Sequence, residues 1–285
     1  MEEFKSYLEV DRHSAKRTVY DKVGRLKEFL GYVRTNKVDL YSKQTIRSFL
    51  SQYSKPEVSI YRYLNRLKAI RVFYQSRDRK DLIETFKLPR PPPSFPSIPT
   101  KSELDSFYHR LTRPRDRALF LLLASSGLRL SEVLGLRRSD IEFQNRRIVP
   151  QGVHQTESTK RSFYSYYNEE SERVLTEYLS TRQDSNPFVF KGIQANDYNT
   201  PETGHIANST VETIYRKTCD GETQITPQSL REWFAEEMSE RGLAERYIDF
   251  FCGRTPKSVL ARHYSDFRPE KMKPRYDKAG LTVLS

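Results

Sequence analysis

The chain has 285 residues, of which 36% are hydrophobic and 12% aromatic, and this is enough apolar material to exclude global disorder. At roughly 100–200 residues per domain, this length predicts about two domains. The net charge of +12 favours a polyanionic partner, most commonly a nucleic acid. Two cysteines, Cys219 and Cys252, exclude a disulfide scaffold, and no CxxC or His/Cys cluster predicts a metal site.

The sequence offers no targeting or membrane segment. Its first five residues, MEEFK, are charged from the start, and no apolar run reaches about 18 residues. We therefore expect a soluble, cytoplasmic protein with no membrane partner, associated with the nucleoid if its host is prokaryotic.

Residues 1–87 are predicted to form an all-helical domain. Apolar residues recur at helical spacing over 19–33 and 60–70, and a shorter helix is expected near 42–52. This region has a net charge of +9, whereas the rest of the chain has +3. Any one of its cations is most simply part of a solvated helix face, but together they favour a surface that contacts DNA phosphates. The candidates are Lys16, Arg17, Lys22, Arg25, Arg62, Arg66 and Arg71.

A linker separates this domain from the rest of the chain. Residues 88–99 read LPRPPPSFPSIP and contain six prolines, which remove backbone donors and favour an extended connector. Thr100 and Glu103 then have the spacing of a capping box at the start of a helix. The expected organisation is a helical domain over 1–87, a linker over 88–99 and a second domain over 100–285.

The second domain is expected to be of the α+β type, with most residues in helices and a small β-hairpin or sheet. A buried helix is predicted over 114–126, with its proline in the first turn and Gly127 at its end. Another helix is expected near Leu130. The remaining predictions are strands at 146–150 and 162–167, and helices near 169–182, 208–218, 227–241 and 244–252.

Two arginines occupy positions suited to phosphate binding. Arg129 follows a glycine turn at the start of a helix, and Glu132, three residues later, shares its helix face and can hold the guanidinium. A fixed planar fork matches a pair of phosphate oxygens, although an ordinary salt bridge at a helix start gives the same pattern. Gln228 and Arg231 also have i, i+3 spacing, which places them on one face of their helix.

Three segments together resemble the active-site boxes of tyrosine recombinases, the lambda-integrase family. They are SGLRLSEVLGLRRSDI at 126–141, TPQSLREWFA at 226–235 and CGRTPKSVLARHY at 252–264. Their order and spacing are similar to those of the family, and the helical first domain resembles the family's core-binding domain. The resemblance covers essentially the whole chain.

The resemblance implies a site-specific recombinase or integrase that cuts and rejoins duplex DNA through a 3′-phosphotyrosyl intermediate, without metal or cofactor. It implies that Arg129 and Arg231 clamp the scissile phosphate and that Tyr264 is the nucleophile. It also implies a lysine on a β-hairpin, for which Lys160 is the best match. Lysine is a plausible general acid for the departing 5′ oxygen. The implied working unit is a homotetramer on two DNA sites.

Two positions depart from the family pattern. Gln228 stands where the second box usually has histidine, and Arg254 stands where the third box has histidine or tryptophan. Arginine at this place resembles integrases of archaeal viruses and plasmids. Because glutamine takes no proton near neutral pH, we expect both residues to bind the phosphate rather than to shuttle protons.

Two other functions are compatible with the same residues. A type IB topoisomerase shares the arginine, lysine and tyrosine chemistry but acts as a monomer on unpaired sites. A catalytically inactive DNA-binding regulator would be consistent with the departures at Gln228 and Arg254, but it would not need both arginines, a lysine and the tyrosine.

The C-terminal region holds further candidates. Tyr247 is expected to pack within an amphipathic helix, and Tyr276, in a basic segment, is expected at the surface. The apolar tail over 279–285 either docks on a neighbouring subunit or forms a terminus that is frayed or packed on its own domain.

Overall fold

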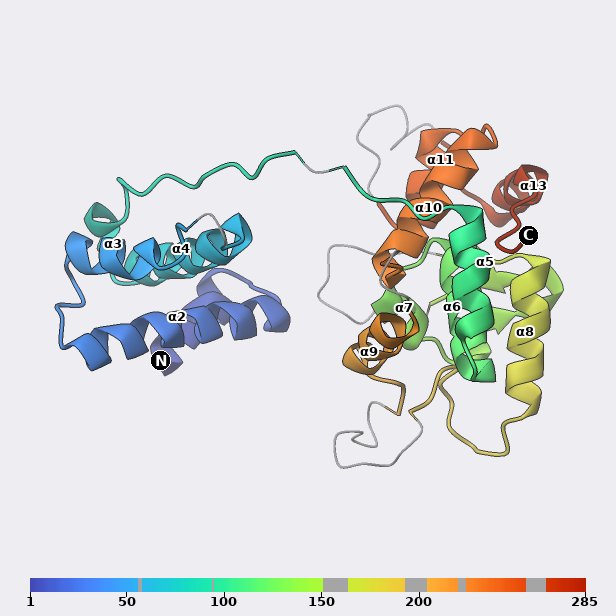
Figure 1. The fold of residues 1–285 in the computed structure, drawn as a ribbon, viewed down its shortest axis with the longest axis horizontal. Coiled ribbons are helices and arrows are strands. Elements are labelled where there is room, and N and C mark those ends of the chain that lie inside the picture. The colour runs from blue at the N-terminus through green and yellow to red at the C-terminus, as the bar shows by residue number, and fades with distance from the viewer. Residues whose placement is uncertain (56–57, 94, 151–163, 193–203, 220–223, 255–264) are drawn as a thin grey trace. The chain divides into compact units, whose positions relative to one another are not determined.

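The computed structural model describes residues 1–55, 58–93, 95–150, 164–192, 204–219, 224–254 and 265–285. The chain divides into two compact units, Met1–Ser94 and Phe95–Ser285 (Figure 1). No helix within these described ranges is long and apolar enough to span a bilayer.

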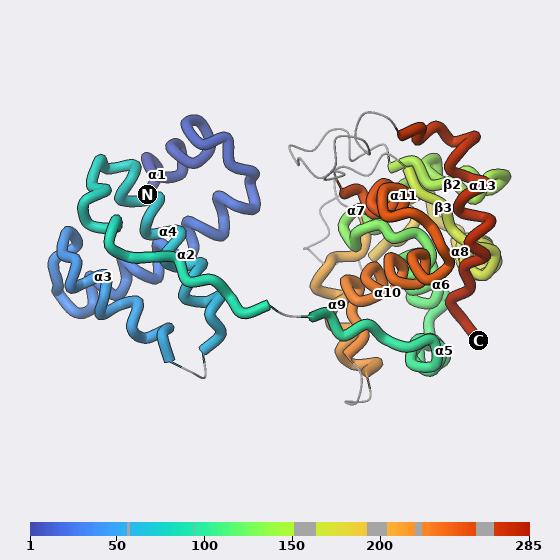
Figure 2. Tube along the Cα trace, turned by 90° about the horizontal axis from the view of Figure 1, so that it is seen from above, coloured from blue at the N-terminus to red at the C-terminus, as the bar shows by residue number. Residues whose placement is uncertain are grey.

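The first unit is entirely helical, as predicted. Its elements are α1 (Glu2–Ser6), a π-helical turn (Tyr7–Asp11), α2 (Lys16–Asn36), α3 (Lys43–Ser51), α4 (Ile60–Gln75) and a 3-10 turn (Lys80–Leu82). Helices α2 and α4 run side by side and make the main contact of the unit (Figures 1 and 2). The three helices expected from the apolar spacing are therefore confirmed, and α1 with its π-helical extension is additional.

Aromatic rings from four segments form the core of this unit. Phe29 of α2 meets Phe49 of α3 edge-on, with ring centroids 5.1 Å apart. Phe4 of α1 meets Phe73 of α4 in the same way at 5.9 Å. Such edge-to-face pairs add to the stabilisation from burial alone. Because Phe4 is buried against α4, the N-terminal segment belongs to the core of the unit.

The first helix of the second unit begins at the predicted position. The backbone N–H of Thr100 donates to the Glu103 carboxylate at 2.6 Å, and the backbone N–H of Glu103 donates to the Thr100 hydroxyl at 3.3 Å. This reciprocal pair is a capping box, and it opens α5 at Lys101. No helix or strand occurs at the described positions of residues 88–99.

The second unit is mostly helical and contains one small sheet, which confirms the expected fold class. Strands β1 (Ile141–Glu142), β2 (Arg147–Ile148) and β3 (Ser165–Tyr166) pair antiparallel in that order. The described helices are α5 (Lys101–Arg110), α6 (Pro114–Ser126), α7 (Leu130–Leu134), α8 (Glu169–Ser180), α9 (Asn208–Thr218), α10 (Pro227–Glu240), α11 (Glu245–Phe251) and α13 (Pro269–Ala279). The expected helices are present, whereas the strands are shorter than predicted, and β1 and α13 were not expected.

Helix α6 is the centre of the second unit. Every residue over 118–126 is buried, and the helix packs against α8 and α10. Gly127 ends it with a φ of +66°, a conformation that side chains disfavour. A Cβ atom at this position would lie 2.5 Å from the ring of Phe234 on α10. The glycine therefore allows both the turn and the close approach of α10.

Helix α13 corrects the expectation for Tyr276. This tyrosine is buried, and its hydroxyl donates to the Ser125 carbonyl at 2.7 Å, so it is not at the surface. Met272 and Ala279 are buried on the same face of α13. The apolar face was missed because Pro274 lies within the helix and most of the intervening residues are charged.

The C-terminal tail packs on its own unit, the second of the two alternatives for residues 279–285. Leu281 and Val283 are buried, and the Glu170 carboxylate accepts the backbone N–H of Val283 at 2.6 Å and of Leu284 at 3.2 Å. The tail also meets α5, where Lys101 Nζ donates to the Thr282 hydroxyl at 2.7 Å and Ser285 N donates to Asp105 at 3.3 Å. The C-terminus accordingly lies beside α5 (Figure 2).

Glu170→Ala is expected to destabilise the protein by about 1–3 kcal/mol, because backbone N–H groups of the tail lose a charged acceptor. Chemical unfolding of the full-length protein measures this change. Glu169→Ala is the matched control, since Glu169 is exposed and pairs with the partly buried Arg146 at 2.9 Å; its expected cost is at most about 1 kcal/mol. Equal losses for the two variants would contradict this role of Glu170.

Candidate active site

Arg129 is held by Glu132 at the start of α7. Its backbone N–H donates to Glu132 Oε2 at 2.7 Å, and its Nη1 donates to Glu132 Oε1 at 2.9 Å. Glu132 is buried, whereas the Arg129 side chain is 27% exposed. The guanidinium is therefore fixed by a buried carboxylate while part of it faces solvent, which is the arrangement expected from the i, i+3 spacing.

Arg231 of α10 joins the three sequence boxes. It is 4% exposed, and it donates from Nη1 to the Gly127 carbonyl at 2.5 Å and from Nη2 to the Cys252 carbonyl. Arg129 donates from Nη2 to the next carbonyl, that of Gly253, at 3.2 Å. Two arginines from different helices thus bind consecutive carbonyls of the third box.

Two other arginines lie near Arg231. Burial lowers its pKa, the positive charges of Arg129 and Arg254 lower it further, and the charges of Cys252 and Glu132 oppose this shift. A guanidinium still keeps its proton under these conditions, so the cluster attracts anions. Such preorganised donors stabilise negative charge that develops during a reaction. No group of acidic, histidine or cysteine side chains able to hold a metal occurs in the described part of the chain.

Arg254 and Gln228 differ in their relation to this cluster. Arg254 follows Gly253, and its Nη1 lies 3.6 Å from Asp249 Oδ1. Gln228 is exposed, and its Nε2 donates to Glu232 Oε1 at 2.8 Å. The structure therefore brings Arg254 near Arg231, whereas no described hydrogen bond joins Gln228 to the arginines.

Lys160 and Tyr264 lie outside the described residues. The strands that flank the Lys160 segment in sequence, β2 and β3, pair antiparallel, with Arg147 opposite Tyr166. This is the pairing that the expected hairpin requires.

Some of the candidate DNA contacts in the first unit bind their own unit instead. Arg66 is 7% exposed, pairs with Glu28 at 2.6 Å and lies 3.9 Å from the centroid of the Tyr53 ring. Its expected place on a solvated face is wrong, because α2 and the chain after α3 enclose it. Arg71 donates to the Phe86 carbonyl at 2.8 Å, which also ties it to the unit.

The other candidates remain accessible. Lys16, Arg17 and Arg62 are exposed, Arg17 pairs with Asp21 at 3.2 Å, and the partly buried Arg25 pairs with Glu28 at 2.7 Å. Lys22 is also partly buried.

Lys22 belongs to a cationic group that the sequence pattern did not reveal. Burial lowers its pKa, and the nearby charges of Arg12 and Lys68 lower it further. Among the described residues, no ion pair joins these three cations to a carboxylate. The group forms because α2 and α4 pack together, so only the fold could have shown it.

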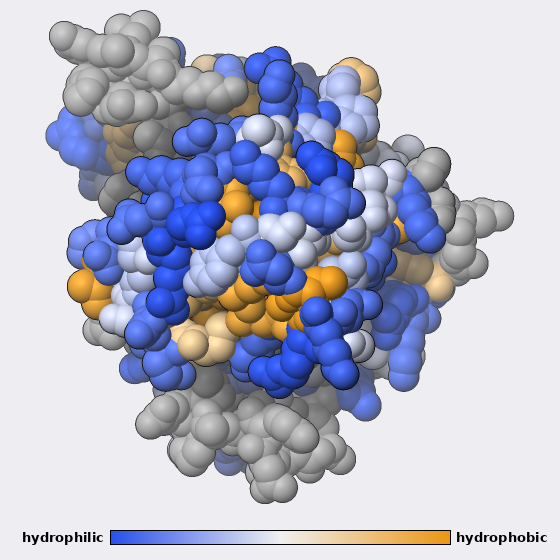
Figure 3. Space-filling model, turned by 90° about the vertical axis from the view of Figure 1, so that its left-hand side faces the viewer, coloured by the Kyte–Doolittle hydropathy of each residue, from blue (hydrophilic) through white to orange (hydrophobic). Residues whose placement is uncertain are grey.

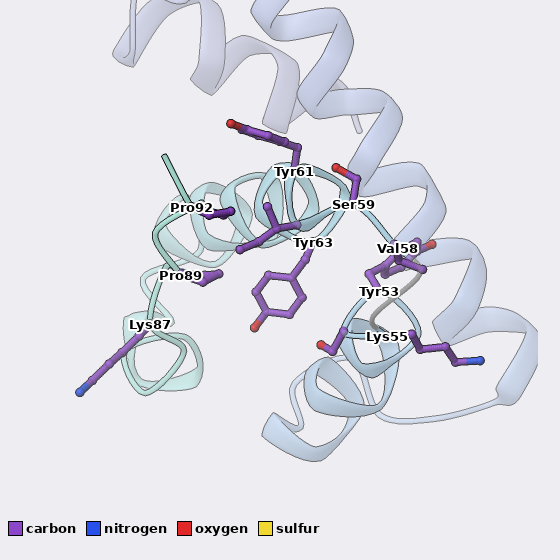
Figure 4. A pocket seen from close by; sticks show the side chains of 11 residues that line it. Tyr53, Lys55, Val58, Ser59, Tyr61, Tyr63, Lys87, Pro89 and Pro92 are labelled. Carbon is purple, nitrogen blue, oxygen red and sulfur yellow. The ribbon is translucent and has the colours of Figure 1, made fainter. Parts of the chain in front are cut away.

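A cavity of about 740 Å³ lies in the first unit, far in sequence from the arginines (Figure 4). Its lining includes three tyrosines and two prolines, among them Tyr53, Tyr63, Pro89 and Pro92. Its described lining contains no carboxylate, histidine or cysteine, so it offers no acid–base or metal chemistry comparable to the arginine cluster.

Comparison with known proteins identifies the family. Residues 100–270 match the family model described as the phage integrase family. The chain belongs to that family. Its members are DNA strand transferases, so the predicted family and enzyme class are confirmed, and neither the topoisomerase nor the inactive-regulator alternative is favoured.

Relatives of this phage integrase family member include an archaeal recombinase. Tyrosine recombinase XerA of Pyrococcus horikoshii is 28% identical over 292 residues, which cover 100% of this chain and 95% of the relative. Among solved structures, the Tn1549 transposon integrase in complex with a circular intermediate DNA has a TM-score of 0.64 and 15% identity, covering 95% and 97% of the two chains. The XerH recombinase bound to its difH substrate has a TM-score of 0.58 and 16% identity, covering 89% and 78%. These structural likenesses support the fold.

Proposed function

We propose that this phage integrase family member cuts and rejoins duplex DNA at specific sites, acting in the cytoplasm where that DNA is located. The observation that carries the proposal is the anchoring of Arg129 and Arg231 on consecutive carbonyls, directly before Arg254. A cluster of fixed cations that ends, in sequence, just before the segment with Tyr264 has the chemistry needed to hold a scissile phosphate.

In the proposed reaction, Tyr264 attacks the phosphate clamped by Arg129 and Arg231. Tyr264 loses its phenolic proton to solvent, and the bond from its Oη to phosphorus forms as the bond from phosphorus to the 5′ oxygen breaks, leaving a 3′-phosphotyrosyl link. Lys160 gives a proton to the departing 5′ oxygen. A 5′ hydroxyl of the partner strand then attacks the link, its proton returns to Lys160, and the released tyrosine takes a proton from solvent. Each step exchanges one phosphodiester for another, so no external energy source is needed.

Arg254 and Gln228 are assigned to phosphate binding in this scheme. Arg254 supplies a third guanidinium, and its partly exposed position leaves donors available to an incoming oxygen. Gln228 supplies one neutral donor from the surface once its contact with Glu232 is released.

The excess of positive charge in residues 1–87 supports their assignment to DNA binding through phosphates. We assign residues 88–99 to a linker and residues 100–285 to catalysis. Four copies are proposed to assemble on two DNA sites. In Figure 3, hydrophilic side chains cover most of the visible face around a smaller apolar area. The proposed phosphate contacts are Lys16, Arg17, Lys22, Arg25 and Arg62, together with Arg12 and Lys68.

Lys68→Ala is expected to lower the salt dependence of DNA binding, because each lost phosphate contact reduces the slope of log K against log salt by about 0.9. Affinity of the full-length protein for duplex DNA, measured over a series of salt concentrations, gives this slope. Arg79→Ala is the matched control, since Arg79 pairs with Asp81 at 3.0 Å. An unchanged slope for Lys68→Ala would show that the group of Lys22, Arg12 and Lys68 does not contact DNA phosphates.

The proposed function is tested by incubating the full-length protein with DNA from its own genomic context in the presence of a metal chelator. A covalent protein–DNA adduct on a denaturing gel is expected. Two differently labelled duplexes should also exchange strands and form a paired complex. Absence of the adduct, or relaxation of supercoiled DNA without strand exchange, contradicts the proposal.

A further inference from the structure

The end of α11 fixes the backbone of Arg254 beside Asp249. Gly253 has a φ of +52°, and its N–H donates to the Phe250 carbonyl at 2.9 Å, while the N–H of Arg254 donates to the Asp249 carbonyl at 2.8 Å. This pair of hydrogen bonds around a left-handed glycine is a Schellman ending. It returns the chain toward the last turn of α11, so the side chains of Arg254 and Asp249 start from adjacent backbone positions.

The two side chains form a loose ion pair. Arg254 Nη1 lies 3.6 Å from Asp249 Oδ1, beyond hydrogen-bond distance, and the two side chains are 43% and 13% exposed. The carboxylate therefore attracts the guanidinium and limits its movement. It forms no hydrogen bond with it, so the N–H donors of Arg254 stay available. A guanidinium has five N–H groups, so Arg254 can bind another anion while it stays near Asp249.

Each arginine of the cluster is held differently. Arg129 is bound by the Glu132 carboxylate and the Gly253 carbonyl, and Arg231 by two backbone carbonyls. Arg254 has only the contact with Asp249 among the described ion pairs and side-chain hydrogen bonds. Its positive charge also lies close enough to Arg231 to lower the pKa of that residue, after the larger effect of burial. Repulsion from Arg231 therefore favours an outward movement of Arg254, and Asp249 opposes it.

We propose that Asp249 is a positioning residue that keeps Arg254 beside Arg129 and Arg231 until the scissile phosphate binds. The phosphate then becomes the partner of Arg254, because it lies among three cations, whereas the partly exposed contact with Asp249 is weak. The inference rests on the proposed function, since it assigns Asp249 a part in the same cleavage step. Asp249 itself touches neither the DNA nor the reacting atoms.

The test compares Asp249→Asn in the full-length protein and in an Arg254→Ala background. In the wild-type background, the rate constant of adduct formation should fall roughly ten-fold, within the range for residues of one ion-pair network. DNA affinity should stay the same or increase, because one negative charge is removed. In the Arg254→Ala background, the same substitution should cause no further loss. Asp249→Glu, which keeps the charge, should restore most of the rate.

Glu245→Gln is the matched control, because it removes one negative charge from an exposed position of the same helix. It should leave the rate unchanged. Equal rate losses for Asp249→Asn in both backgrounds would assign Asp249 a merely structural role and overturn the inference. A wild-type rate for Asp249→Asn would also overturn it, as would a loss of DNA affinity that parallels the loss of rate. Adduct formation by the unsubstituted protein reports on the proposed function separately. If Asp249→Asn does not fold, Asp249→Ala, which also removes the carboxylate, replaces it in the two backgrounds with the same expected outcomes.

Discussion

Tyr264→Phe is expected to abolish the covalent adduct while folding and DNA affinity stay close to those of the unsubstituted protein. The change removes one oxygen, which is the proposed nucleophile, and little packing. A phenol, with an ordinary pKa of about 10, attacks poorly until it loses its proton. The arginines proposed to clamp the phosphate should favour the phenolate as they favour the phosphate. A nicked substrate that loses a short strand after cleavage traps the adduct, and mass spectrometry locates it.

Two other tyrosines of the same region serve as controls. Tyr276 is buried, burial raises its pKa, and its hydroxyl donates to the Ser125 carbonyl, so it is held neutral away from solvent. Tyr247 is buried beneath Arg275, whose guanidinium carbon lies 4.3 Å from the ring centroid. Tyr247→Phe and Tyr276→Phe should still form the adduct. DNA attached to either residue, or cleavage by Tyr264→Phe, would show that the nucleophile is assigned wrongly.

Arg231→Lys is expected to slow adduct formation at least about 100-fold, the usual loss when one donor to a developing negative charge is removed. A lysine ammonium cannot reproduce the fork that reaches both Gly127 and Cys252, so one buried carbonyl loses its partner. The stability cost should be about 1–3 kcal/mol. Single-turnover cleavage, DNA affinity and chemical unfolding separate these effects.

Arg173→Lys provides the comparison for Arg231→Lys, since Arg173 is exposed on α8 and the same chemical change there should alter neither cleavage nor stability. Cleavage by Arg231→Lys at the rate of the unsubstituted protein would mean that Arg231 supports the fold but does not act on the phosphate.

Elements with strong local signals could be predicted from the sequence. Helix α6 combines a dense apolar run with Pro114 in its first turn and Gly127 at its end, and the capping box at Thr100 defines where α5 begins. Helix α13 lacks such signals, because its few apolar residues are spread among charges and Pro274 interrupts the pattern. Strand β1 has only two residues, which is too short for any alternation to be visible.

The candidate site shows the same division between local and tertiary information. The contact of Arg129 with Glu132 follows from i, i+3 spacing on one helix. Arg231 binds carbonyls that are 104 and 21 residues away in sequence. Every residue has a backbone carbonyl, so the sequence does not show which ones an arginine will bind. Burial of Arg66 was missed for a related reason, since helical spacing marks its face but not the Glu28 and Tyr53 side chains that cover it.

The contacts of the tail with α5 mean that the first helix and the last residues of the second unit lie at the same place. Lys101 bonds to Thr282 and Asp105 bonds to Ser285, so its first helix and its last residues are already joined without a covalent bond. Units whose ends meet tolerate circular permutation and insertion into other proteins. A short peptide from Ser285 back to the start of α5 would close this unit into a ring, and new termini could then be opened at an exposed loop elsewhere on its surface.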